Sequence, residues 1–351
     1  MTAPTRSRRA VLRGLASAAS ALSLGGCASL ASTGLTSDGS ALATHPSLVV
    51  ATTRRPVKGG REKPWFGSER GSTVTLARAR FTPPETGRFS LSAVGLGDWR
   101  LDAVEPAPTL GELLAEDTAG QGGGQSDGPG AVLGIGRDVL IYVHGYNQTF
   151  EMAALDAARL SDGIRFQGET MMFSWPSKAK LLDYGYDRES AMWSRDALER
   201  VLANVMESAG VGRLHIVAHS IGTMLTMEAL RQLAARQTDV AALKIGSVVF
   251  ASPDIDVDVF KSSIERVGPL AAKITLVTAT NDRALAVSGL LAGGISRVGA
   301  AEKAQLEGLG LRVIDASENG WGIINHDLFL SNAQVRQVIR NVIDGKPAMG
   351  A

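Results

Sequence analysis

Cysteine is almost absent from this chain: Cys27 is the single one among 351 residues. A lone thiol cannot close an intramolecular disulfide, so a disulfide-stabilised scaffold is excluded. The chain also has no cluster of cysteine and histidine at the spacing of a metal site, and we expect it to bind no metal. With 44% hydrophobic content, the chain is long enough for one large α/β domain or two small ones.

An excess of charge of one sign and a membrane-spanning run are also lacking. The 36 Lys and Arg residues nearly balance the 35 Asp and Glu residues, which gives no reason to expect a nucleic-acid partner. Beyond the amino-terminal region, no segment reaches the roughly eighteen uninterrupted apolar residues that cross a bilayer. Gly134 and Gly136 follow no strand and lack the third glycine of a dinucleotide fingerprint, so a nucleotide cofactor is not expected.

The first residues are typical of an export signal. Arg8 and Arg9 precede a weakly apolar stretch, and the segment closely resembles bacterial twin-arginine (Tat) signal peptides. Residues 24–27, Leu-Gly-Gly-Cys, resemble a lipobox, in which the cysteine is lipidated and becomes the first residue of the mature protein. The resemblance predicts a signal peptide over residues 1–26, the Tat translocase as a partner during export, and a lipid anchor at Cys27.

These features predict where the mature protein resides and where its folded part begins. We expect it on the periplasmic side of the cell envelope, anchored to a membrane; a soluble periplasmic protein and a cytosolic protein with a fortuitous leader are the alternatives. Residues 27–47 are rich in Ser, Thr, Gly and Ala and predict a flexible tether. Residues 48–345 are expected to form a single domain, with a glycine-rich surface loop over residues 120–136.

The segment around Ser220 is the strongest single feature. Residues 214–217 form an apolar run typical of a buried strand, and residues 221–230 read as a helix. A serine between a strand and a helix, with the small residues Ala218 and Gly222 two positions away on either side, matches a nucleophile elbow. There the serine hydroxyl stands at the tip of a tight turn, above a helix amino terminus that favours negative charge.

Strands and helices alternate along most of the chain. Short alternating patches between residues 73 and 101 suit antiparallel edge strands, and residues 189–207 show the apolar spacing of a helix. Buried strands, two of them with an outgoing loop, are predicted over residues 139–143, 170–177, 214–217, 247–256, 273–280 and 311–315. The alternation predicts an α/β fold with a mostly parallel, doubly wound sheet.

Several motifs together carry a resemblance to a known superfamily. They are residues 50–54, 143–147, 173–177, 218–222, 251–256 and 281–285, together with His326. This set resembles a poorly characterised bacterial branch of the α/β-hydrolase superfamily over most of residues 48–345. The resemblance implies the α/β-hydrolase fold and a serine, acid and histidine triad.

The resemblance also assigns roles near the first core strand. A strand that ends in His-Gly is similar to the oxyanion-hole loop of α/β-hydrolases, which implies backbone donors at Gly145 or, preferably, Tyr146, with Ile221 after the serine as the second donor. His144 is interpreted as a structural turn residue. For Trp175, which follows a strand, pocket lining and core packing stay open.

The order of residues along the chain selects the remaining triad members. In α/β-hydrolases the order is serine, acid, histidine, and His326 is the only histidine after Ser220. His219, at the variable position of the elbow, is expected to point away from the site. For the acid, Asp282 is preferred because it follows the strand before the last. Asp254 and Asp256 are alternatives one strand earlier, and Asp315 is a weaker one.

The implied chemistry is two-step acyl transfer through an acyl-enzyme on Ser220, without a metal or organic cofactor. The sequence therefore predicts a serine hydrolase of the cell envelope that acts on a small-molecule or lipid-like ester. The alternative is a non-catalytic envelope lipoprotein that uses the hydrolase fold as a binding module. Amide or thioester substrates would use the same triad.

Overall fold

The structure of the chain, a computed structural model, describes residue 42 and residues 46–58, 64–84, 98–119, 136–236, 242–291, 294–317 and 326–346. The predicted signal peptide, Cys27, nearly all of the tether and nearly all of the glycine-rich loop lie outside the described residues.

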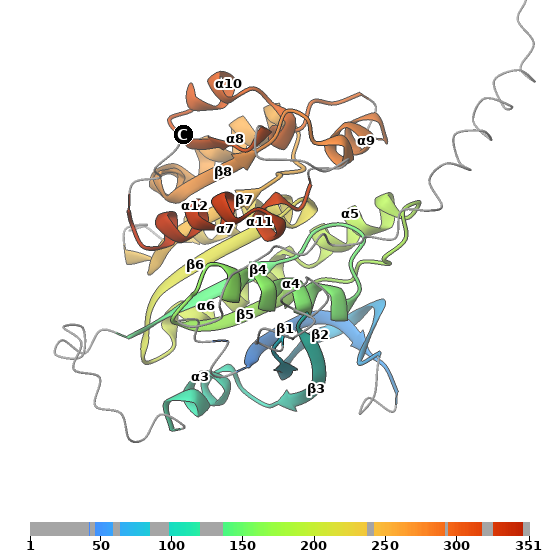
Figure 1. The fold of residues 1–351 in the computed structure, drawn as a ribbon, viewed down its shortest axis with the longest axis vertical. Helices are drawn as coiled ribbons and strands as arrows, with labels where there is room; N and C mark the ends of the chain where they lie inside the picture. The colour runs from blue at the N-terminus through green and yellow to red at the C-terminus, as the bar shows by residue number, and fades with distance from the viewer. Residues whose placement is uncertain are drawn as a thin grey trace, which may run out of the picture.

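The described strands form one nine-stranded sheet with the order β3-β2-β1-β5-β4-β6-β7-β8-β9 (Figure 1). They are β1 (Ser47–Pro56), β2 (Phe66–Thr82), β3 (Arg100–Ala107), β4 (Arg137–Val143), β5 (Glu169–Ser174), β6 (Val211–His219), β7 (Ile245–Ala251), β8 (Ile274–Thr278) and β9 (Arg312–Asp315). β2 pairs antiparallel with β1 and with β3, whereas every other pairing is parallel. This confirms the predicted mostly parallel sheet with antiparallel strands from the front of the chain.

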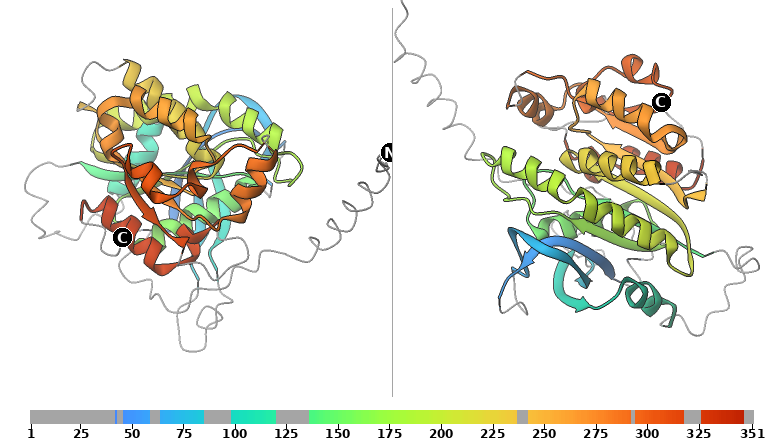
Figure 2. Two further views of the ribbon diagram at one scale, coloured as in Figure 1. Left: turned by 90° about the horizontal axis from the view of Figure 1, so that it is seen from above. Right: turned by 180° about the vertical axis from the view of Figure 1, so that it is seen from behind.

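Helices cover both faces of the sheet (Figures 1 and 2). They are α3 (Leu110–Ala119), α4 (Phe150–Gly163), α5 (Tyr184–Trp193), α6 (Arg195–Glu207), α7 (Ile221–Arg236), α8 (Val257–Val267), α9 (Arg283–Leu291), α10 (Lys303–Glu307), α11 (Leu328–Ser331) and α12 (Ala333–Ile343), with short 3₁₀ turns η3 (Gly268–Lys273) and η4 (Val298–Ala300). None of these described helices is both long enough and apolar enough to cross a membrane.

The two cores follow from the alternation of side chains along each strand. In β4, Ile141 belongs to the core under α6, α7 and α8, whereas Tyr142 belongs to the core under α4, α11 and α12. Because both faces are covered, apolar residues predominate along the central strands, as is typical of parallel sheets. Among the described residues, each core is continuous across the sheet.

The prediction of one helix over residues 189–207 is wrong in one respect. The segment forms parts of two helices, α5 and α6, which meet at Ser194. The Ser194 hydroxyl donates to Ser190 O (2.9 Å), and its backbone N–H also bonds to Ser190 O (3.1 Å) and to Ala191 O (3.0 Å). Such local bonds compete with continuation of a helix. The apolar spacing within α6 is nevertheless the one predicted, with Leu198 and Leu202 fully buried.

The carboxyl ends of the parallel strands gather the loops that carry the candidate residues. Tyr146 follows β4, Ser220 follows β6, Asp282 follows β8, and His326 follows β9. In β6, Ala218 is paired with Val143 on one side and with Phe250 on the other, so the segment that leads to Ser220 lies within the sheet. Ligands of open α/β sheets bind at this edge.

Candidate active site

Ser220 forms the turn between β6 and α7 in a strained conformation. Its φ is 51°, in the left-handed region that residues other than glycine rarely adopt and that costs about 1–3 kcal/mol. The turn is held by its backbone: Ser220 N–H donates to Ala251 O (3.0 Å), and its carbonyl accepts from Thr223 N–H (3.0 Å) and Asp254 N–H (3.3 Å). A nucleophile elbow has this geometry.

Close approaches explain the small residues around the serine. A Cβ added to Gly222 would lie 2.4 Å from His144 O, and one added to Gly145 would lie 2.9 Å from Ser220 Cβ. A side chain at Gly222 would require movement of the His144 backbone, and one at Gly145 would displace the side chains of His219 and Ser220. Ala218, in the strand before the elbow, is fully buried and its methyl group is accommodated. The loop after β4 therefore lies directly against the turn that carries Ser220.

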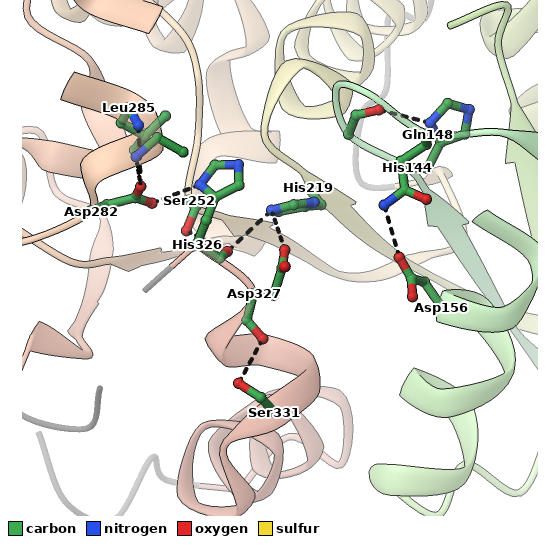
Figure 3. Close-up of polar contacts among 12 residues, drawn as sticks. His144, Gln148, Asp156, His219, Ser252, Asp282, Leu285, His326, Asp327 and Ser331 are labelled. Carbon is green, nitrogen blue, oxygen red and sulfur yellow. Dashed lines mark hydrogen bonds and ion pairs between the residues drawn. The ribbon is translucent and has the colours of Figure 1, made fainter. Parts of the chain in front are cut away.

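His326 is hydrogen-bonded to the carboxylate of Asp282 (Figure 3). The distance between His326 Nδ1 and Asp282 Oδ2 is 2.8 Å, and the carboxylate is fully buried. Its other oxygen, Oδ1, accepts from the N–H groups of Ala284 (3.0 Å) and Leu285 (3.1 Å) in the first turn of α9. A carboxylate there is stabilised by the free N–H groups and dipole of the helix. Of the aspartates considered, Asp282 is the one that the structure pairs with His326.

Asp254 and Asp256, the main alternatives to Asp282 as the triad acid, have structural partners elsewhere. Asp254 is buried in an ion pair with Arg297 (3.0 Å) and accepts hydrogen bonds from Tyr184 and Ser288, each at 3.0 Å. Asp256 caps α8 through two N–H groups of its first turn. Neither carboxylate contacts His326 within the described part of the chain, so the structure does not bring these alternatives for the acid together with the candidate base.

The backbone of His326 is fixed by two side chains near the elbow. Its carbonyl oxygen accepts from His219 Nε2 (3.2 Å) and from Ser252 Oγ (3.2 Å), and the two histidine rings lie 4.6 Å apart (Figure 3). The expectation that His219 points away from the site is wrong. Burial and the neighbouring His326 hold the pKa of His219 well below its usual value, so this ring is neutral and carries its proton on Nε2, as donation to the carbonyl requires.

The environment of His326 makes it a stronger base than an ordinary histidine. Burial alone would lower the pKa of His326, but the hydrogen bond and charge of Asp282, with the charges of Asp327 and Asp254, outweigh burial and raise the pKa. In the neutral ring, Nδ1 carries the proton and donates to Asp282, which leaves Nε2 as the acceptor. No hydrogen bond joins Ser220 Oγ to His326 among the described residues, and such bonds often tighten only when substrate is bound.

Two backbone N–H groups near Ser220 are free to bind an anion. Ile221 begins α7, and the first N–H groups of a helix have no acceptor within the helix. Tyr146 lies in the loop that packs against Ser220, and its phenol donates to Lys180 O (3.1 Å) and to Leu181 O. Within the residues that the structure describes, neither N–H donates to a protein acceptor. The predicted oxyanion-hole residues thus lie on the two segments that meet at the serine.

His144 and Trp175 are structural residues. Both are fully buried, and their rings stack with centroids 4.7 Å apart. Trp175 N–H donates to His144 Nε2 (3.1 Å), so the neutral ring carries its proton on Nδ1 and donates to Gly145 O (2.8 Å). Burial and the charge of Arg54 lower the pKa of His144 to about 3. Trp175 packs in the core, and the alternative that it lines a pocket is wrong.

Metal binding finds no support in the described part of the chain, where no group of three His, Cys, Asp or Glu side chains is arranged to hold an ion. Cys27 lies outside the described residues. The expected absence of a metal or cofactor therefore stays a prediction.

The strand order, the elbow and the loops at the carboxyl edge define an α/β-hydrolase. The family model described as "Alpha/beta hydrolase of unknown function (DUF900)" matches residues 135–342, more than half of the chain, so the protein belongs to this family. The uncharacterized protein alr1448 of Nostoc sp. is 26% identical over 122 residues, which cover 28% of this chain and 32% of that protein. The chain thus spans about a third of the curated relative it matches.

Solved structures with a similar chain path include esterases. An esterase from Pyrobaculum calidifontis is 12% identical, covers 86% of each chain and has a TM-score of 0.39. The catalytic core domain of acetyl xylan esterase from Trichoderma reesei is 11% identical, covers 60% of this chain and 98% of its own, and has a TM-score of 0.35. At these identities and scores the similarity does not define an activity for this protein.

Proposed function

We propose that this protein is a serine hydrolase that cleaves carboxylic esters, with Ser220 as nucleophile, His326 as general base and Asp282 as the acid that orients the base. One observation carries the proposal: the 2.8 Å hydrogen bond between His326 and Asp282 lies at the strand edge that also holds the strained Ser220 turn. Membership in an α/β-hydrolase family supports the class of reaction. A fold retained only for binding has no need of this pairing.

In the first step, the ester acylates the serine. His326 Nε2 takes the proton of Ser220 Oγ as the oxygen forms a bond to the ester carbonyl carbon. The carbonyl oxygen becomes an anion that accepts from the N–H groups of Tyr146 and Ile221, where one donor is typically worth about 10²–10³ in rate. The bond to the alcohol oxygen then breaks, and His326 returns the proton to that oxygen.

In the second step, water releases the acyl group. His326 takes a proton from a water molecule that attacks the acyl carbon, the same N–H groups bind the second anion, and the bond to Ser220 Oγ breaks as the proton returns to it. The scheme uses no metal or organic cofactor. A small-molecule or lipid-like ester is the proposed substrate class, and amides or thioesters would follow the same steps.

Labelling with a fluorophosphonate probe tests the proposal, because the probe reacts with an activated serine and mimics acylation. We expect the wild-type protein to be labelled and Ser220→Ala to remain unlabelled. Ser263→Ala is the matched control: this buried serine in α8 donates to Val259 O (2.8 Å) and should leave labelling unchanged. A folded wild-type protein that stays unlabelled would favour the alternative of a binding module in the cell envelope.

We propose further that the protein is exported and held at the periplasmic side of a membrane by lipid on Cys27. The twin arginines and the Leu-Gly-Gly-Cys segment support this, and acyl chains contribute about 0.8 kcal/mol of membrane affinity per buried methylene. In the native host grown with labelled palmitate, the wild-type protein should carry label and sediment with membranes, whereas Cys27→Ser should do neither. Membrane sedimentation of Cys27→Ser to the wild-type extent would contradict the proposal.

A further inference from the structure

Two buried charged side chains take no part in the proposed reaction. Arg54 lies near the end of β1 with 1% of its surface exposed, and Asp187 lies fully buried in α5. Within the described residues neither contacts Ser220, Asp282 or His326. Burying a charge is costly unless hydrogen bonds replace the lost water, so the partners of these two groups indicate their role.

The carboxylate of Asp187 binds the backbone of two loops, one after β4 and one after β5. Its Oδ2 accepts from Asn147 N–H (3.2 Å) and its Oδ1 accepts from Lys178 N–H (2.8 Å). Asn147 has a φ of 60°, so the residue directly after Tyr146 is in the left-handed region. Asn tolerates this conformation better than most residues, and a hydrogen-bond partner that holds it there offsets the remaining cost. Asp187 supplies that partner.

Arg54 binds the next residue of the same loop. Its Nη2 donates to Gln148 O (2.8 Å), while Nη1 donates to Ser177 O (3.0 Å) and Nε donates to Ser174 Oγ (2.9 Å). A planar guanidinium directs these donors in fixed directions, which a lysine cannot do. Arg54 therefore fastens the loop after β4 to the end of β5.

Ser177 joins the two charged groups. Its hydroxyl donates to Asp187 Oδ2 (2.5 Å) and accepts from Gln148 N–H (3.0 Å). The N–H groups of Asn147 and Gln148 are thus both bound by side chains, those of Asp187 and Ser177. The N–H of Tyr146, one residue earlier, has no acceptor in the described part of the chain and lies on the segment that packs against Ser220.

We infer that Asp187 and Arg54 are positioning residues for the oxyanion hole: they fix residues 147 and 148 so that the Tyr146 N–H stays free beside the nucleophile. The inference rests on the proposed function and goes beyond it, because neither side chain touches the reacting atoms. Asp187 accepts from the N–H of Asn147, the left-handed residue of this loop, and Arg54 donates to the carbonyl oxygen of Gln148. The two charged groups, with Ser177, therefore hold the two residues directly after Tyr146.

Replacing Asp187 by asparagine tests this role, because the amide keeps the shape and loses the charge. We expect kcat for p-nitrophenyl acetate, counted per site titrated with a fluorophosphonate, to fall about 10- to 100-fold, below the loss of a whole oxyanion donor. KM should change little, since the donor acts mainly on the anion. Inhibition by an aryl trifluoromethyl ketone, which forms a serine-bound oxyanion, should weaken by the same factor as kcat/KM.

Glu169→Gln is the matched control. Glu169 is also buried, pairs with Arg78 (3.4 Å), and lies at the start of β5, the opposite end of the strand from Ser174. Its variant should lose stability but keep the wild-type kcat per titrated site. Ser177→Ala provides a second test that leaves both charges in place, and it should lower kcat per titrated site in the same direction.

The outcomes separate this inference from the proposed function. If the wild-type protein turns over the ester and both Asp187→Asn and Ser177→Ala keep its kcat per titrated site, the positioning role is wrong and the serine hydrolase stands. If the wild-type protein neither turns over the ester nor reacts with the fluorophosphonate, the proposed function fails, and the inference with it. A parallel fall in kcat/KM and in ketone affinity supports both.

Discussion

Replacing His326 by alanine should lower kcat for p-nitrophenyl acetate by about 10⁶, the loss expected when the base of a serine triad is removed. The serine hydroxyl then has no acceptor for its proton, and an uncharged hydroxyl is a weak nucleophile near pH 7. The loss corresponds to about 8 kcal/mol in the activation barrier. Rates measured at saturating ester with purified protein provide the test.

The fold should survive this substitution. The ring of His326 is partly exposed, and the bonds that hold its segment are made by the backbone carbonyl to Ser252 and His219, which an alanine keeps. The melting temperature should therefore stay close to that of the wild type. His215→Gln is a suitable control, because His215 is buried in the middle of β6, five residues before Ser220, is bonded to Ser247, and should affect stability without reducing the rate per titrated site. Loss of folded structure in step with loss of activity would show that His326 is structural.

Replacing Asp282 by asparagine should lower kcat by about 10⁴, because the amide holds the imidazole in the wrong tautomer and no longer stabilises its charged form. The pH dependence gives the second readout. In the wild type the pKa of His326 is raised, and the base must be neutral, so kcat/KM should rise with pH through a midpoint above the usual histidine value of about 6.5. Without the Asp282 charge, burial dominates, the pKa falls, and the midpoint should move to lower pH.

Asp315 provides the control for this experiment. It lies at the end of β9, is exposed, and accepts from Ser317 N–H (2.9 Å) rather than from His326. Asp315→Asn should leave both the rate and the pH midpoint unchanged. An acid limb that stays at its wild-type position in Asp282→Asn would mean that this carboxylate does not set the protonation of the base.

The fold and the position of the elbow could be predicted because they depend on local patterns. Apolar runs mark the strands around Ser220, and Ala218 and Gly222 mark the close crossing of strand and helix. The choice of Asp282 over Asp254 was harder, since both follow the ends of neighbouring strands. Only the fold shows that Asp254 forms an ion pair with Arg297, which lies 43 positions later in the chain.

Other features depend on contacts between distant segments. The hydrogen bond between Arg54 and Gln148 spans 94 positions. The motif at residues 50–54 contributes to the family resemblance but assigns no role to the Arg54 side chain. The sequence predicts that His219 points away from the site, because its actual partner is a backbone carbonyl, a group that every residue carries and no motif marks. Ser194 divides α5 from α6, and its hydroxyl competes for the helix carbonyls, whereas the apolar spacing that predicts a helix lies within α6 alone.

The base joins the site from the far end of the polypeptide. His219 and His326 touch although 107 positions separate them, and all nine described strands are synthesised before His326. A nascent chain therefore carries the serine and all of the described strands before the ribosome adds the imidazole that activates the serine. On the proposed mechanism the newly made protein is inactive until the segment that carries His326 packs beside Ser220. Premature termination or proteolytic trimming ahead of residue 326 would leave it permanently so.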